Sequence, residues 1–206
     1  MKLTRWLRPV HRKFREEKIN LFFRALCPTP TDTLLDVGGG AGIIGEFLDL
    51  YSYFRKVTIL NIHQMQIDAT EGDTMIELIV GDGCSMPFMQ QSFDFVFSNA
   101  VIEHVGSWRS QKVFADEINR VAKKGYFVTT PNKNFPIEPH TLLPFYQFMP
   151  TGIQRALVKI SPGYLTRYEP IRLLSSRELQ MLFPNARVLK IGLPLLHNNL
   201  VAFCRR

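Results

Sequence analysis

The segment TLLDVGGGAG, from Thr33 to Gly42, holds the residues of this sequence whose types and spacing point most directly to chemistry. A short apolar run ends in Asp36, and four glycines then fall within five positions. Each glycine costs about 0.5–1 kcal/mol relative to alanine in regular structure, so this cluster indicates that a ligand approaches the backbone closely. A strand, a glycine-rich turn and a helix in this order predict a nucleotide-type site at the carboxyl end of a parallel sheet.

The spacing of the glycines narrows the class of ligand. No Gly-Lys-Ser/Thr follows them, which argues against a phosphate-binding P-loop. The dinucleotide pattern G-x-G-x-x-G would need a glycine at position 43, where Ile43 stands. The pattern present is D-x-G-x-G-x-G, formed by Asp36, Gly38, Gly40 and Gly42.

This pattern looks like motif I of the class I S-adenosylmethionine (SAM)-dependent methyltransferases, and two further stretches agree with it. The stretch IVGDGCSMPFMQQSFDFVFSNAVIEHV resembles the middle of the type 11 group, which includes the UbiE/UbiG-like enzymes. The stretch LLSSRELQMLFPNARVLKIGL resembles the C-terminal helix and strand of the same group. The resemblance covers about Leu34 to Phe203 and implies a methyltransferase with SAM as its cofactor.

The resemblance also implies which residues hold SAM. The methionine end would lie on Asp36 and the glycine loop, the ribose at the end of the second strand, the adenine after the third strand, and the sulfonium after the fourth. In that order, the implied cofactor-binding residues are Asp36, Gly38, Gly39, Gly40 and Gly42; Asn61 and Ile62; Asp82, Gly83 and Cys84; and Ser98 and Asn99.

Asn61 departs from the family pattern. Members of the family usually carry an acidic residue there, which grips both ribose hydroxyls, whereas asparagine offers a single acceptor oxygen. We therefore expect SAM binding to be weaker by ~1 kcal/mol. The departure leaves open a second class of function, a methyltransferase-like binding module without catalytic activity.

Methyl transfer from SAM is an in-line displacement, and a base helps when the acceptor is a hydroxyl that must lose a proton. His104, in VIEHVG, and His140, in FPIEPHTLL, are the candidate bases, and Glu103 and Glu138 are candidates to orient them or to bind substrate. Either histidine can instead be a structural loop residue. We expect no metal site, because the five histidines are scattered along the chain and the three cysteines form no close pair.

The elements around these residues predict one domain over residues 1–206. The predicted strands are 33–37, 56–61, 76–80, 93–98, 126–130, 186–191 and 200–204, and the predicted helices are 43–50, 64–70, 109–122 and 175–183. Apolar strands that alternate with helices predict an α/β, Rossmann-like, mostly parallel seven-stranded sheet with helices on both faces. The short link between the last two strands predicts that they pair antiparallel.

Residues 131–175, called the insert below, interrupt the alternation with prolines, aromatic residues and a short helix expected near 152–160. The insert is too long for an ordinary loop, and we expect it to cover one end of the sheet and shape the acceptor pocket. Its aromatic residues favour a hydrophobic or lipid-linked acceptor.

The net charge of +7 is concentrated in a basic helical arm over residues 1–27. Residues 1–24 carry eight cations and two glutamates, while the rest of the chain carries 17 cations and 16 anions. An apolar stripe from Leu3 to Phe14 predicts an amphipathic helix, which Pro9 would interrupt or restart. Such an arm can pack on its own domain, contact an anionic membrane surface peripherally, or bind nucleic acid.

These features together predict a SAM-dependent methyltransferase that acts on a small-molecule or lipid-linked acceptor, at oxygen rather than carbon or nitrogen. An RNA methyltransferase is the rival enzyme, but the body is nearly neutral and no NPPY-type motif follows the fourth strand, so nucleic acid is an unlikely partner. Separate cysteines, no apolar leader segment and no run of about 18 apolar residues predict a cytoplasmic protein.

Overall fold

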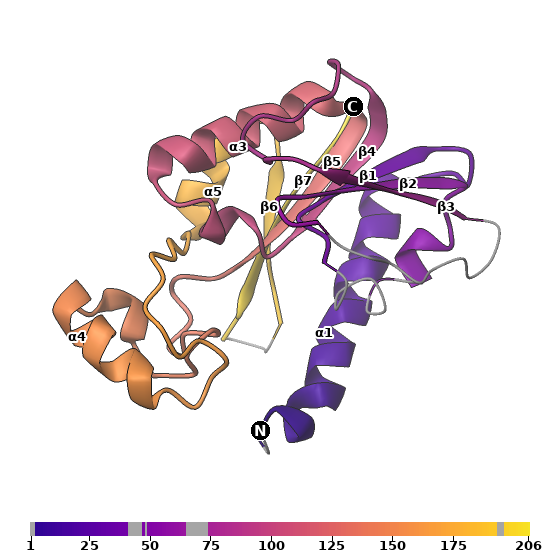
Figure 1. The fold of residues 1–206 in the computed structure, drawn as a ribbon. Helices are drawn as coiled ribbons and strands as arrows, with labels where there is room; N and C mark the ends of the chain where they lie inside the picture. The colour runs from indigo at the N-terminus through magenta and orange to yellow at the C-terminus, as the bar shows by residue number, and fades with distance from the viewer. Residues whose placement is uncertain (1–2, 41–46, 48, 65–73, 193–195) are drawn as a thin grey trace.

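A computed structural model describes residues 3–40, 47, 49–64, 74–192 and 196–206. Their strands form one seven-stranded sheet in the order β3-β2-β1-β4-β5-β7-β6 (Figure 1). The first five strands are parallel, and β7 runs antiparallel to both β5 and β6, as predicted. The strands are β1 (Thr33–Val37), β2 (Lys56–Asn61), β3 (Met75–Val80), β4 (Phe93–Asn99), β5 (Ala122–Pro131), β6 (Arg187–Ile191) and β7 (Asn199–Arg205).

The helices lie on both sides of this sheet. They are α1 (Leu3–Leu26), η1 (Ile102–His104), α3 (Trp108–Val121), η2 (Tyr146–Phe148), α4 (Thr151–Leu157), η3 (Val158–Ile160) and α5 (Ser176–Leu182). Residues 47 and 49–51 are also helical, in agreement with the predicted helix at 43–50. Residues 43–46 and 48 of that helix, and 65–70 of the helix predicted at 64–70, lie outside the described residues. Among the residues described, no helix has the length and apolar character needed to cross a membrane.

The alternation of side chains along each strand builds two cores, one on each face of the sheet. In β1, Leu35 and Val37 join the core beneath α3 and α5, whereas Leu34 joins the core beneath α1 and residues 47–51. Figure 1 shows the same division, with α3 and α5 on one side of the sheet and α1 on the other. Both faces are covered, which explains why the central strands are apolar throughout.

The N-terminal arm is one continuous helix, so the predicted interruption or restart at Pro9 is wrong. Proline removes a single N–H donor from a helix of 24 residues, and the C-terminal half of that helix is anchored by burial of Ile19, Phe22 and Leu26. Phe22 makes edge-on contacts with aromatic rings of β4 and β5. The arm is therefore partly a core element, while its N-terminal part projects beyond the sheet (Figure 1).

The insert lies at the carboxyl end of the sheet, at the same end of the molecule as the projecting part of α1 (Figure 1). It has a small core of its own, centred on Tyr146, Val158 and Leu165. The predicted helix at 152–160 is present as α4 followed directly by η3. The insert ends where Ser175 starts α5 with a reciprocal capping box to Glu178, which fixes the return of the chain to the sheet.

Candidate active site

A cavity of about 640 Å³ opens at the carboxyl ends of β1 to β4, where the order of the strands reverses. This is the place where open α/β sheets bind their ligands, and the volume suits a ligand of cofactor size. Seven of the residues expected to form the site line this cavity: Gly38, Asn61, Ile62, Asp82, Gly83, Cys84 and His104.

The other expected site residues stand behind or beside the cavity. Among the described residues, those that do not line it are Asp36, Gly39, Gly40, Ser98, Asn99 and His140. Gly42 lies outside the described residues. The wall contributed by α3, which includes Arg109 and Val113, was missed from the sequence. The residue that marks this wall is Val113, an apolar side chain of α3 that is 39% exposed and is not needed for the packing of the helix.

Two glycines let the backbone form the cavity wall. Gly38 has φ +87°, in the left-handed region, and a Cβ there would lie 2.4 Å from Cγ2 of Val101. A Cβ on Gly83 would lie 2.6 Å from Cε2 of the fully buried Phe114. Both positions therefore require glycine for close approach of neighbouring side chains, and any larger residue must displace the wall.

Asp36 faces away from the cavity because strand alternation directs its side chain to the opposite face from Val37. It is 2% exposed, and the Tyr51 hydroxyl donates a hydrogen bond to its carboxylate. Burial raises the pKa of Asp36 from 3.8 to about 7, and the bond from Tyr51 only partly offsets this. Asp36 thus lies behind the glycine loop, on the side away from the cavity. Its hydrogen-bond partner Tyr51 was not predicted.

The raised pKa of Asp36 predicts a dependence of stability on pH. Its contribution is fully present below about pH 4 and is lost as the pH rises to about 7, because the unfolded state releases the proton first. We expect Asp36→Asn to be more stable than the wild type at pH 8 but not at pH 5. Urea unfolding at pH 5, 6, 7 and 8 tests this; equal pH slopes for both proteins would contradict it.

At the end of β2, where the sequence predicts the ribose, the Asn61 amide is already hydrogen-bonded to the backbone. Its Nδ2 donates to the carbonyl of Gly39 at 2.7 Å, and its Oδ1 accepts from the backbone N–H of His63 at 2.9 Å. One lone pair of Oδ1 remains for a ligand hydroxyl. Asn61 therefore braces the glycine loop and offers less to a ribose than a carboxylate would.

After β3, where the sequence predicts the adenine, Asp82 orders its own turn. Its Oδ1 accepts the backbone N–H of Cys84 at 2.8 Å, and its carboxylate borders the cavity. Burial, together with the charge of Asp82, raises the pKa of the Cys84 thiol to about 11. Cys84 is therefore a neutral, unreactive wall of the cavity at physiological pH.

The two residues that end β4 are committed to structural hydrogen bonds. The Ser98 hydroxyl donates to the carbonyl of Val37 at 3.0 Å and is fully buried. Asn99 Oδ1 accepts from Lys18 Nζ at 2.9 Å and from Thr129 Oγ1 at 2.7 Å. They hold β4 to β1, to β5 and to α1, next to the cavity rather than in its wall.

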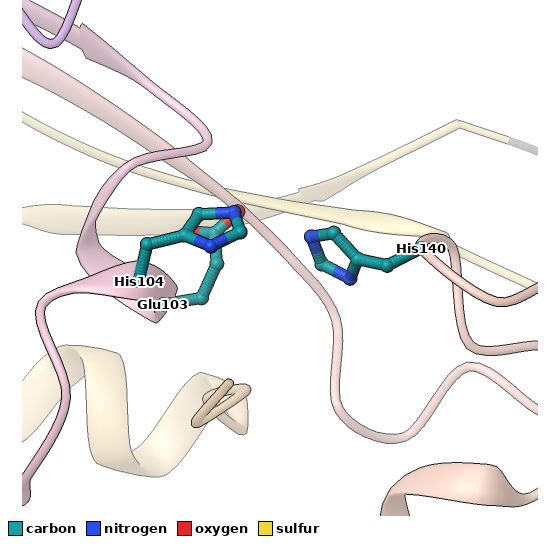
Figure 2. Close-up of side chains that lie close together, drawn as sticks. All are labelled: Glu103, His104 and His140. Carbon is teal, nitrogen blue, oxygen red and sulfur yellow. The ribbon is translucent and has the colours of Figure 1, made fainter. Parts of the chain in front are cut away.

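Glu103, His104 and His140, called the Glu–His cluster below, converge beside the cavity although 36 residues separate the two histidines (Figure 2). The two imidazole rings are edge to face, with centroids 5.0 Å apart, and the Glu103 carboxylate lies close to the His104 ring. The two histidines are distant along the chain, but both lie in loops that leave the carboxyl edge of the sheet, and this brings their side chains together. The first two residues come from η1, after β4, and His140 comes from the insert, after β5.

Hydrogen bonds fix the cluster from behind. His140 Nδ1 is hydrogen-bonded to Glu138, whose other carboxylate oxygen accepts from the backbone N–H and the hydroxyl of Thr141. Thr130 Oγ1 donates to Glu103 Oε2 at 2.9 Å. The sequence predicted that Glu103 and Glu138 orient the histidines or bind substrate. The hydrogen bond between Glu138 and His140 supports the orienting role for Glu138.

The electrostatics of the cluster follow from burial. Burial raises the pKa of Glu103 to about 6, although the bond from Thr130 and the nearby His140 and Lys18 oppose the shift. Burial by itself raises the pKa of Glu138. The hydrogen bonds from His140 and Thr141 outweigh burial and hold this pKa below its ordinary value. Partial burial and the neighbouring His140 lower the pKa of His104.

Comparison with known proteins agrees with the fold. Residues 35–129 match a family model described as a methyltransferase domain of type 11. The fold is similar to a SAM-dependent methyltransferase from Methanosarcina mazei (17% identity, 87% of this chain and 94% of that chain, TM-score 0.60) and to a protein from Pyrococcus horikoshii OT3 (15% identity, 94% and 90%, TM-score 0.62). It is also similar to the 1,6-didemethyltoxoflavin-N1-methyltransferase of Burkholderia thailandensis, solved with S-adenosylhomocysteine (12% identity, 93% and 77%, TM-score 0.59).

The sheet order, the glycine-walled cavity at its switch point and the domain match define a class I SAM-dependent methyltransferase. Residues 35–129 match the type 11 methyltransferase domain, and SAM is the cofactor that this match and the fold support. The residues present fit this cofactor: the Asp82 carboxylate borders the cavity, Gly38 and Gly83 allow close approach, and Asn61 retains one lone pair. The match to a methyltransferase domain favours an enzyme over a non-catalytic module.

Proposed function

We propose that this enzyme methylates a hydroxyl oxygen of a hydrophobic acceptor, small or lipid-linked, that binds beside the Glu–His cluster at the rim of the cavity. When bound, SAM supplies the electrophilic methyl group, so the chain's own residues need only place the acceptor, exclude water and receive a proton. A hydroxyl needs such a proton acceptor more than an amine or thiol does. The convergence of His104 and His140 at the cavity rim is the observation that carries this proposal.

His104 is the member of the pair that lines the cofactor cavity, and its side chain is exposed, so it can meet an acceptor directly. His140 is 4% exposed and is held by Glu138. We assign His104 to contact with the acceptor hydroxyl and His140 to orienting and polarising the cluster behind it. Methylation at oxygen gives this pair the task of receiving the hydroxyl proton.

The surface of the insert supports a hydrophobic, membrane-borne acceptor. Helix α4 buries no residue. No acidic residue occurs from Leu142 to Tyr168, a stretch that contains three cations, Arg155, Lys159 and Arg167. Large apolar side chains are exposed on the same stretch: Phe145, Phe148, Ile153, Ile160 and Tyr164. An apolar surface with only basic charges suits an anionic lipid surface.

The basic arm supplies a second contact for such a surface, in the form of peripheral attachment through residues 1–24. Deleting the arm is a poor test, because Phe22 belongs to the core. We expect Arg5→Glu/Arg8→Glu/Lys13→Glu to fold normally and to lose sedimentation with vesicles of 30% anionic lipid. Retained sedimentation of this variant would contradict a role for the arm.

Transfer of a labelled methyl group tests the proposed function. The full-length protein is incubated with methyl-tritiated SAM and either a lipid extract or a water-soluble metabolite extract, and labelled products are located by mass spectrometry. We expect label in the lipid fraction, on oxygen. We also expect Phe148→Ser/Ile160→Ser to lower transfer to vesicle-borne acceptor several-fold without changing SAM affinity. Label on nitrogen or carbon, or only in water-soluble products, would contradict the proposal.

A further inference from the structure

We propose that the Glu–His cluster binds a divalent cation of the zinc type at the acceptor end of the active site. Each member offers one ligand atom, and these three atoms lie within 4.8 Å of one another. Figure 2 shows the His140 ring directed at the His104 ring, with the Glu103 carboxylate close to the latter. Two imidazoles and one carboxylate are the donor set of many catalytic zinc sites, which keep a further position open for water or substrate.

The unsatisfied oxygen of Glu103 is the observation that points independently to a ligand. Glu103 is 0% exposed, and Thr130 satisfies its Oε2. Its Oε1 is buried and has no hydrogen-bond partner among the residues that the structure describes. Buried carboxylate oxygens without a partner are costly and rare in folded proteins, so the free oxygen calls for a cation or a donor from a ligand.

The position of His140 matches that of a metal ligand held by an outer carboxylate. Its Nδ1 is hydrogen-bonded to Glu138, so the proton stays on that nitrogen and the lone pair of Nε2 faces the cluster. Metal-bound histidines almost always donate their second nitrogen to a carboxylate or carbonyl in this way. Glu138 is itself fixed by Thr141, so the ring enters the cluster with a set orientation.

The cluster must contract when the cation binds. Bonds of about 2.0–2.2 Å from Zn²⁺ to nitrogen and oxygen place ligand atoms well under 4.8 Å apart. His104 is the exposed member and ends a single short turn, so rotation of its side chain can close the gap while the two buried members stay in place. The remaining position faces the cavity rim, where the proposed function places the acceptor hydroxyl.

This inference rests on the proposed function only for its catalytic consequence, because a bound cation would acidify the acceptor hydroxyl by coordination. In that state, His104 and His140 would act as ligands, and the cation would lower the pKa of the acceptor hydroxyl so that its proton leaves to water instead of to a histidine. Binding of the cation itself depends on the geometry of the three side chains alone.

The test is direct titration of the tag-free, full-length protein after dialysis against EDTA. We expect one equivalent of Zn²⁺ to bind with micromolar or tighter affinity by calorimetry, and Co²⁺ to give the visible absorption of a four- or five-coordinate site. Glu103→Gln and His104→Asn should each weaken binding at least tenfold, and Glu138→Gln should weaken it about 10–100-fold through His140. His63→Asn, which changes an exposed histidine outside the cluster, is the matched control and should bind as the wild type does.

Two outcomes overturn the proposal: no saturable binding up to 100 µM Zn²⁺, or binding that Glu103→Gln and His104→Asn both leave unchanged. Glu103→Gln preserves shape, and His104→Asn alters an exposed side chain, so thermal unfolding should confirm that both variants fold. A methyl-transfer assay distinguishes failure of this proposal from failure of the proposed function. Full transfer to a lipid acceptor by the EDTA-treated enzyme overturns the cation role alone, whereas normal Zn²⁺ binding without oxygen methylation overturns the proposed function alone.

Discussion

His140→Ala is expected to lower kcat for methyl transfer by about 10²–10⁴-fold while SAM still binds, because the residue that orients the proton-accepting cluster is removed. His140 does not line the cofactor cavity, so calorimetric SAM affinity should change by less than about twofold. The substitution empties a buried position, and His140→Gln therefore serves as a second variant that fills it. Steady-state kinetics with a saturating acceptor measure the effect.

The outcome separates a catalytic contribution from a structural one. A merely structural His140 would lower the melting temperature and SAM affinity together and leave kcat of the folded fraction unchanged. Glu138→Gln should reproduce part of the loss of kcat, because it keeps a hydrogen-bond acceptor but removes the charge beside His140. Full activity in both variants would contradict the proposed role of the cluster.

Gly38→Ala is expected to destabilise the fold by about 2–5 kcal/mol and to weaken SAM binding strongly. Two costs add: a left-handed φ of +87°, worth about 1–2 kcal/mol for a residue with a Cβ, and a contact of 2.4 Å with Val101, an overpacking cost of about 1–3 kcal/mol. Urea unfolding and calorimetry with SAM measure the two effects.

The chain offers a matched control for separating these two costs. Gly106 has a similar φ of +93°, but a Cβ there meets nothing within 4 Å. Gly106→Ala should therefore show the backbone cost alone. Adding Val101→Ala to Gly38→Ala should recover part of the lost stability, because it removes the two closest methyl carbons. Equal destabilisation by Gly38→Ala and Gly106→Ala, or no recovery in the double variant, would contradict the close-contact explanation.

The sheet was predictable because its signals are local. Apolar runs separated by helices, and a short link before β7, led to the right strands within one to four residues at each end and to the right antiparallel pairing. The glycine spacing led to the cofactor cavity for the same reason, since a strand, a tight turn and a helix are consecutive in the chain. Pro9 misled because local rules ignore the tertiary anchor that Phe22 provides for the rest of α1.

The composition of the active site beyond the glycine loop depended on tertiary structure. The sequence placed His104 and His140 in loops at the same edge of the sheet, but only the packing of the insert brings their rings to 5.0 Å. Asp36 was expected at the cofactor, yet strand alternation turns it toward Tyr51. The free Oε1 of Glu103 exists because η1 and β5 enclose that side chain together. Local spacing in this chain thus determines its backbone elements and its cofactor class, whereas side-chain convergence depends on long-range packing that no short segment encodes.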